Sequence, residues 1–267
     1  GCGVGAGGVG AYTFLWEPHW VEFRRVSLPI RGLPVALAGK RLVQITDLHV
    51  GPRVSDDFLL ETFRKVAQMA PDVVVYTGDF ISYEAGILAH AERVLSELPR
   101  GQRGTFGVLG NHDYGINWAD AELADEIAGI ARNSGVTILR NEVAEVDGLQ
   151  VAGLDDLWAD QFDAPKGLAE LQRDMAAIVL SHNPDTADLP VWGDFSGWIL
   201  AGHTHGGQCK APFLPPPLLP VKNRRYTSGK FELAGGRGMY ISRGLGHLLK
   251  VRFNVRPEVT VFRLETA

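Results

Sequence analysis

Cysteine is scarce in this sequence, since the 267 residues contain only Cys2 and Cys209. Two cysteines are too few to build a disulfide-stabilised scaffold. Hydrophobic residues make up 45% of the chain and charged residues 21%, which excludes a disordered or collagen-like protein and indicates a globular one with a sizeable core. The formal net charge of −5 lacks the basic excess of a general nucleic-acid binder. We therefore expect no nucleic-acid partner.

The first 16 residues carry no charge, and six of the first ten are glycine. This run is too short to span a bilayer, which takes about 20 apolar residues, and no later run is long enough either. We interpret it as the tail of an export signal or of an N-terminal membrane anchor, with a glycine-rich leader of no consequence as the alternative. We expect residues 1–38 to form a tether and an entry strand, and residues 39–267 to form one domain.

Short apolar runs alternate with segments of helical periodicity after residue 40. Apolar residues recur at helical spacing over 55–70 and 123–135, and over a shorter stretch at 168–175. The apolar runs predict strands at 41–46, 72–77, 104–109, 136–139, 149–153, 177–180 and 197–200. After residue 206 the helical pattern stops, and further strands are expected at 239–242, 251–255 and 259–264. This order predicts an α/β domain that finishes with a β-rich end.

Five of the expected strands run directly into side chains that bind metals. These strand-end motifs are Asp47-Leu48-His49, Gly78-Asp79, Gly110-Asn111-His112-Asp113, Ser181-His182-Asn183 and the segment from Gly202 to Gln208. Sites in α/β sheets form just beyond the carboxyl ends of the strands, so the five motifs are expected at one edge. Each motif alone is weak, but five of the eight histidines fall in this set. The whole pattern predicts a metal site.

The order D-x-H, G-D, G-N-H-D, H and G-H-T-H-G-G-Q resembles the calcineurin-like metallophosphoesterase family over nearly everything after residue 40. The carboxyl-terminal segments 242–246 and 251–258 are similar to a bacterial branch of exported or membrane-anchored phosphoesterases. That branch includes cell-wall enzymes and UDP-diacylglucosamine pyrophosphohydrolases. The resemblance implies an αββα sandwich for residues 39–267, with the metal site at the carboxyl-terminal ends of the strands.

Carried over residue by residue, the resemblance implies two divalent metal ions. One ion would be held by Asp47, His49 and His205, and Asp79 would bridge the two. The other would be held by Asn111, His182 and His203. Mixed imidazole and carboxylate ligands suit manganese, iron or zinc better than calcium or magnesium. We expect manganese, with iron or zinc as the alternatives.

Three further residues are candidates for catalysis. His112 follows a ligand candidate directly and is expected to protonate the departing oxygen or to stabilise the transition state. Asp113 is a candidate to orient the His112 ring, and capping the turn is an equal alternative. Arg243 lies in a glycine-rich turn, where its guanidinium is a candidate to contact phosphate. The alternative for Arg243 is a structural pairing with acidic residues.

The region from Gly206 to Pro257 is strongly basic, with ten Lys and Arg against one acid, Glu232. Its charge of +9 leaves −14 on the rest of the chain and indicates an anionic substrate or surface, unless it is only a solvated rim. Within it, residues 211–221 contain five prolines and no charge. Such a stiff apolar loop favours a lipid-linked substrate, and packing on its own domain is the alternative.

These features together predict a binuclear metal-dependent phosphoesterase that cleaves phosphodiester or pyrophosphate bonds. The expected substrate is a phosphorylated small molecule or a molecule linked to a lipid or to the cell envelope, with a membrane surface as a further partner. A phosphomonoesterase and a nuclease-like diesterase are the enzymatic alternatives, and overall acidity argues against the nuclease. A non-catalytic scaffold is disfavoured because no ligand position is missing. The expected location is the bacterial membrane or envelope.

Overall fold

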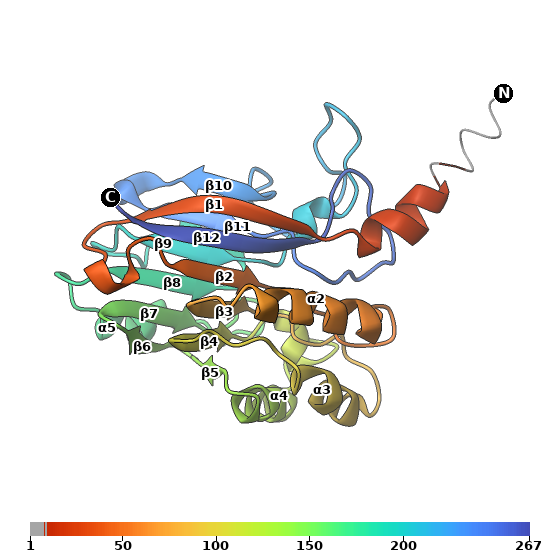
Figure 1. The fold of residues 1–267 in the computed structure, drawn as a ribbon, viewed down its shortest axis with the longest axis horizontal. Coiled ribbons are helices and arrows are strands. Elements are labelled where there is room, and N and C mark those ends of the chain that lie inside the picture. The colour runs from red at the N-terminus through yellow and green to blue at the C-terminus, as the bar shows by residue number, and fades with distance from the viewer. Residues whose placement is uncertain (1–7, 9) are drawn as a thin grey trace.

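Two six-stranded sheets lie face to face in the structure, a computed structural model that describes residue 8 and residues 10–267 (Figure 1). Cys2 lies outside the described residues. The first sheet has the order β1 (Glu22–Ile30), β12 (Glu258–Thr266), β2 (Arg41–Ile45), β3 (Val73–Thr77), β4 (Gly104–Val108) and β5 (Thr137–Ile138). The second has the order β10 (Gly229–Glu232), β11 (Gly238–Ile241), β9 (Trp198–Ala201), β8 (Ala177–Ser181), β7 (Leu149–Leu154) and β6 (Glu142–Val146).

Parallel strands form the centre of both sheets. Strands β2 to β5 run parallel, and so do β7, β8, β9 and β11. Strand β12 is antiparallel to β2, and β6 and β10 are antiparallel to their neighbours. The carboxyl ends of the parallel strands that precede the metal-binding motifs therefore meet at one edge of the molecule.

The core between the sheets explains why the central strands are continuous apolar runs. Val73 and Val75 point into the layer between the sheets, where Ile178 and Leu180 also lie. Val74 points to the opposite side, toward the helices. Since both faces of these strands are covered, neither face can carry polar side chains without a buried partner.

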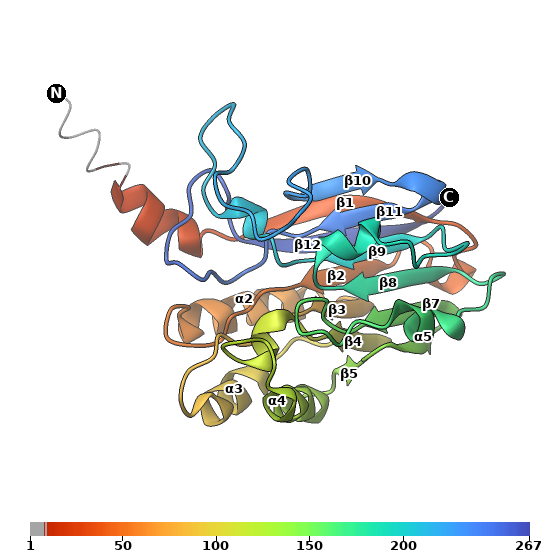
Figure 2. The same cartoon turned by 180° about the vertical axis from the view of Figure 1, so that it is seen from behind.

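Helices cover the outer faces of both sheets, so the predicted α/β sandwich is confirmed (Figure 2). Helices α2 (Asp56–Gln68), α3 (Ile87–Leu95) and α4 (Ala121–Asn133) pack on the first sheet. On the second sheet the outer layer is thinner, with the six-residue α5 (Ala164–Ala169) and short 3₁₀ turns such as Pro184–Asp188.

Most of the expected helices and strands are present, and two of the expectations were wrong. The seven strands expected between 41 and 200 are found with ends within one residue, and α2 and α4 match the helical periodicities. A helical stretch was expected at 168–175, but helix α5 spans Ala164–Ala169, so residues 171–175 are not helical. Residues 251–255 form a loop with a single bridge between Phe253 and Cys209, because Arg252 and Glu17 bond to its backbone where a partner strand would.

The amino-terminal residues extend the first sheet before they leave it. Strand β1 pairs in parallel with β12 along nine residues, so the expected entry strand is an integral part of the sheet. Ahead of it, Tyr12–Trp16 and Glu17–His19 form short helical turns that project beyond the edge of the sheets (Figure 1). Among the described residues, no helix combines the length and the apolar character needed to span a bilayer.

Candidate metal centre

Five loops at the carboxyl ends of β2, β3, β4, β8 and β9 bring the predicted ligands together, as expected. Five of the seven ligand candidates have left-handed backbone conformations, with φ between 49° and 71°: Asp47, His49, Asp79, His203 and His205. Such conformations cost free energy in non-glycine residues and cluster at functional sites. Glycines make the close approach feasible, because a Cβ on Gly78 would lie 2.6 Å from Nδ1 of His182.

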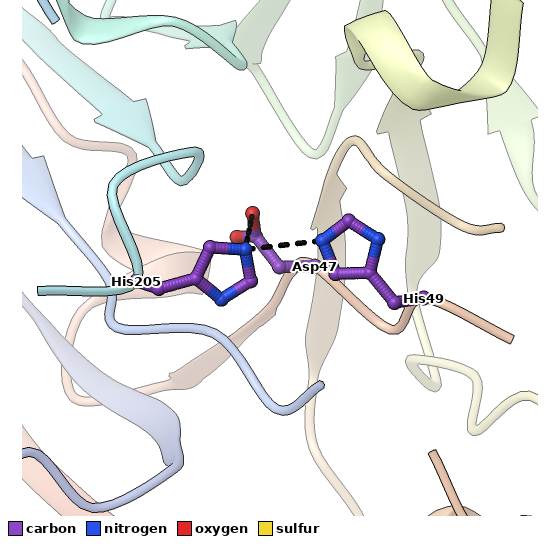
Figure 3. Close-up of side chains that lie close together, drawn as sticks. All are labelled: Asp47, His49 and His205. Carbon is purple, nitrogen blue, oxygen red and sulfur yellow. Dashed lines mark hydrogen bonds and ion pairs between the residues drawn. The ribbon is translucent and has the colours of Figure 1, made fainter. Parts of the chain in front are cut away.

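The first cluster consists of Asp47, His49 and His205, all of them buried (Figure 3). The Nε2 atoms of His49 and His205 are 3.0 Å apart, and Nε2 of His205 lies 3.4 Å from Oδ1 of Asp47. Figure 3 shows the two rings and the carboxylate pointing toward one another. Ligand atoms that converge at this spacing suit a shared cation.

The second cluster consists of Asp79, His182 and His203. Nε2 of His182 lies 3.2 Å from Oδ2 of Asp79 and 3.2 Å from Nδ1 of His203. The same Oδ2 atom of Asp79 lies 3.5 Å from Nε2 of His49, which belongs to the first cluster. One carboxylate oxygen therefore faces both clusters, which is the position predicted for a bridging ligand.

Asn111 lies at the end of β4 and is completely buried. Neither its side-chain oxygen nor its side-chain nitrogen has a hydrogen-bond partner in the structure. Buried amides without partners are costly, and native proteins rarely retain them. An ion that accepts the amide oxygen would remove that cost, so the residue fits the predicted second ion.

Hydrogen bonds behind the rings fix which imidazole nitrogen is free to bind a metal. Nδ1 of His182 donates to the carbonyl oxygen of Thr77 at 2.7 Å, and Nε2 of His203 donates to the carbonyl oxygen of Pro220 at 2.7 Å. The other nitrogen of each ring points into the centre, where it can bind a metal ion when it carries no proton. Nδ1 of His49 lies 3.0 Å from the hydroxyl of Ser82. Such outer contacts orient metal-ligating histidines.

Burial and charge also favour a cation in this centre. Burial lowers the pKa of His49 and of His203 to about 3, so both rings are neutral and have a lone pair available. Burial opposes protonation of His182 as well, but Asp79 and Asp47 raise its pKa to about 10. In the metal-free protein, a proton on His182 thus supplies positive charge that the two buried carboxylates require.

The two residues after Asn111 are placed differently from each other. His112 is half-buried beside the first cluster, with its ring 5.1 Å from that of His49 and its backbone N–H donating to Oδ1 of Asp79. The carboxylate of Asp113 accepts hydrogen bonds from the backbone N–H groups of Gly110 and Ile81. Asp113 therefore caps the turn, which was one of its two expected roles, and its orienting role stays a prediction.

Arg243 pairs with two carboxylates, which is the structural alternative considered for it. Its Nε lies 2.6 Å from Glu258 and its Nη2 lies 2.9 Å from Glu22. Both contacts direct the guanidinium toward the sheet, and its proposed contact with phosphate stays a prediction that this pairing disfavours.

Arg252, one of the ten basic residues between Gly206 and Pro257, supports the backbone next to the centre. It is fully buried and donates to the carbonyl oxygens of Gly244 and Gly246. The backbone N–H of Gly246 in turn donates to the carbonyl oxygen of Asp47. Glu17 anchors the same loop, since its carboxylate accepts the N–H groups of Asn254 and Val255. Such partners cannot be found from sequence, because they come from distant segments.

An aromatic pair borders the centre on the side of His203. The ring of Trp158 stands edge-on to that of His203, with centroids 4.4 Å apart, and stacks on Trp118 at 4.7 Å. The carboxylate of Asp156 accepts the backbone N–H groups of Trp158 and Ala159, which fixes the turn. No motif in the sequence linked Trp118 to the centre, because its contact with Trp158 joins segments that are 40 residues apart.

This fold and these clusters define a class of enzyme. Residues 40–207 match the family model described as calcineurin-like phosphoesterase. The chain therefore belongs to the calcineurin-like metallophosphoesterase family, and it is a hydrolase that acts on phosphoric esters.

Three curated relatives match nearly the whole chain. The sequence is 34% identical to "Uncharacterized metallophosphoesterase YkuE" of Bacillus subtilis, over 98% of this chain and 91% of that protein. It is 30% identical to "Phosphodiesterase YaeI" of Escherichia coli, over 95% and 92%. It is 29% identical to "UDP-2,3-diacylglucosamine pyrophosphatase LpxG" of Chlamydia trachomatis, over 94% and 92%.

Proposed function

We propose that this protein is a binuclear metal-dependent phosphoesterase that hydrolyses phosphodiester or pyrophosphate bonds of a lipid-linked or envelope-linked substrate. The observation that carries the binuclear part is the position of Asp79, whose Oδ2 faces His182 at 3.2 Å and His49 at 3.5 Å. A carboxylate oxygen that faces imidazole nitrogens of both clusters suits one centre with two neighbouring ions better than two separate single-ion sites.

The residues that would hold the ions are those of the two clusters together with Asn111. When bound, two divalent ions supply Lewis acidity, which activates water as a nucleophile and neutralises phosphoryl oxygens. The ligand set mixes imidazole with carboxylate, which suits manganese, iron or zinc, and manganese is the metal we propose to test first. The histidine rings are held in place by Thr77, Ser82 and Pro220, so the ligands are oriented before an ion arrives.

Two kinds of observation support the choice of substrate. Among the relatives, one is named a phosphodiesterase and one a pyrophosphatase of a diacylated nucleotide sugar, and each matches more than nine-tenths of this chain. In the structure, the proline-rich loop 211–221 reaches the centre, since the carbonyl oxygen of Pro220 contacts His203. An apolar loop at the ligands is compatible with a substrate that carries a lipid, and such a substrate favours a location at the bacterial membrane or envelope.

The test is hydrolysis of two soluble esters by the manganese-loaded protein, bis-p-nitrophenyl phosphate and p-nitrophenyl phosphate, together with the metal content per chain. We expect two ions per chain and preferential cleavage of the diester. Asp79→Asn should lower the diester rate about 100-fold or more, because it removes a shared ligand worth several kcal/mol of charge stabilisation.

The matched control is Asp147→Asn. This aspartate is partly exposed, pairs with Arg103 and belongs to neither cluster. It should keep both ions and the parent rate. One ion per chain, or full activity in Asp79→Asn, would contradict the binuclear assignment. A preference for the monoester would instead support a phosphomonoesterase.

A further inference from the structure

Three segments at the metal-binding end of the molecule carry an unusual share of the exposed apolar side chains. Of the eleven large hydrophobic residues that are exposed in the described part of the chain, eight lie in residues 14–20, 213–218 and 249. We call these eight the apolar end: Phe14, Leu15, Trp16, Trp20, Phe213, Leu214, Leu218 and Leu249. Phe213 is fully exposed and Leu218 is 72% exposed.

Hydrogen bonds tie the three segments into one surface although they are far apart in sequence. The backbone N–H of Arg252 donates to the carbonyl oxygen of Thr13, which joins the amino-terminal turns to the loop after residue 246. The side chain of Gln208 donates to the carbonyl oxygens of Leu249 and Val251, which joins that loop to the start of the proline-rich segment. Figures 1 and 2 both show these segments at the same end, beyond the edge of the sheets.

Within the three segments that form the apolar end, the exposed charges are of one sign. In residues 10–20, 209–222 and 247–256, the only acid is Glu17, and it is buried with its carboxylate bonded to backbone N–H groups. The exposed charged side chains of these segments are Lys210, Lys222 and Lys250. A surface that combines exposed aromatic and aliphatic residues with lysines matches the interface of a bilayer with anionic headgroups.

The same surface borders the metal centre. The carbonyl oxygen of Pro220 contacts His203, and a Cβ on Gly207 would collide with Pro216, so the loop lies directly on the metal-binding segment. A molecule anchored in a bilayer and bearing a phosphate at headgroup depth would therefore be held close to the ligands. That relation to the substrate rests on the proposed function, whereas the docking surface itself does not.

We propose that the apolar end docks this protein on the surface of an anionic lipid bilayer. Side chains of the three segments insert at the depth of the headgroups, and the lysines contact the anionic phosphates. The occupant is a lipid surface, because a plain apolar protein interface would not explain three exposed lysines without an acid among them.

Sedimentation with vesicles tests this proposal on the full chain without any substrate. The protein should co-sediment with vesicles of phosphatidylcholine mixed with phosphatidylglycerol and remain in solution with phosphatidylcholine alone. The triple variant Phe213→Ser, Leu214→Ser, Leu218→Ser should bind about ten-fold more weakly, because binding scales with the apolar area that enters the bilayer. The matched control is Val35→Ser with Ile116→Ser, at two exposed apolar residues outside the three segments, which should bind like the parent.

A second pair of substitutions keeps the test informative if the triple variant folds poorly. Lys210→Glu with Lys250→Glu leaves the apolar residues intact and should abolish the preference for anionic vesicles. Equal binding of all variants, or no binding of the parent to anionic vesicles, would overturn the proposal. Dimers of the parent that the triple variant fails to form would also overturn it, since the apolar end would then be an interface between copies. Failure of the proposed function would appear separately, as no hydrolysis of soluble diester by the parent.

Discussion

At the scale of single residues, the centre separates histidines that would bind metal from one that would not. His182 and His203 each have one nitrogen occupied by a carbonyl oxygen and the other directed into the second cluster. The side chain of His112 is half-exposed. It belongs to neither of the two groups of candidate metal ligands found among the described residues. This placement leaves the His112 ring free to approach a substrate.

Replacing this histidine should therefore separate metal binding from turnover. We expect His112→Ala to retain its metal and to cleave bis-p-nitrophenyl phosphate about 10²–10⁴-fold more slowly, which is the usual contribution of a positioned proton donor. Steady-state kinetics and metal analysis of the same preparation measure both effects. The control is His90→Asn, at a histidine of α3 that pairs with Asp56 and Glu84. Loss of metal in His112→Ala, or an unchanged rate, would contradict the role.

At the scale of elements, helices α2 and α3 are joined by a pH-sensitive contact. His90 on α3 lies 2.7 Å from the carboxylate of Asp56, at the start of α2, and 3.2 Å from Glu84. Partial burial opposes protonation of His90, but these two acids raise its pKa above the usual value. A histidine whose pKa is raised by folding stabilises the native state below its unfolded pKa, and this contribution is lost as the pH rises through the folded pKa.

The stability of the protein should reflect this contact. Between about pH 5.5 and about pH 8.5, the free energy of unfolding of the parent should fall by about 0.5 kcal/mol more than that of His90→Asn. Urea unfolding of both proteins with the same metal content measures the difference, in which other titrating groups cancel. Identical pH profiles for the two proteins would show that the ion pairs contribute nothing.

The elements also show what the sequence could predict. Central strands are local patterns, so β2, β3, β4, β8 and β9 were predicted correctly. The motifs after these strands are local patterns too, and the structure brings their side chains close together, while their role as metal ligands stays a prediction. The loop at 251–255 resembles a strand in its apolar content, but the buried guanidinium of Arg252 bonds to its backbone in place of a neighbouring strand. Helix α3 was not predicted, because nine residues give too little periodicity. The pairing of Arg243 with Glu22 depends on residues far apart in the chain.

At the scale of the whole molecule, two sheets bring buried polar groups from five loops to one edge. The seven ligand candidates are at most 4% exposed, and two of them are carboxylates, of which Asp79 faces both clusters. Without ions, these groups are costly to bury, since few of their polar atoms reach water. Metal binding and folding should therefore be strongly linked in this protein.

Chelation should lower thermal stability by an amount that calorimetry can detect. If each site binds an ion at a concentration about 100-fold above its dissociation constant, each contributes about 2.7 kcal/mol, and two together raise the Tm by about 10 °C. Removing the metal with a chelator should reverse this shift, and adding manganese should restore it. In Asp79→Asn the shift should be much smaller. A Tm that is insensitive to metal would mean that the clusters bind no ion tightly.

The contact between Glu17 and the loop at 254–255 gives the amino terminus a second role. Glu17 holds the loop that contains Arg252, Arg252 holds Gly244 and Gly246, and Gly246 contacts the backbone of Asp47. A proteolytic cut between Trp20 and Val21 would thus do more than release the apolar turns, because it would remove the first support in this series. We expect proteolysis at that position to lower the activity while leaving every ligand candidate in place, so the amino-terminal segment supports the centre as well as forming part of the apolar end.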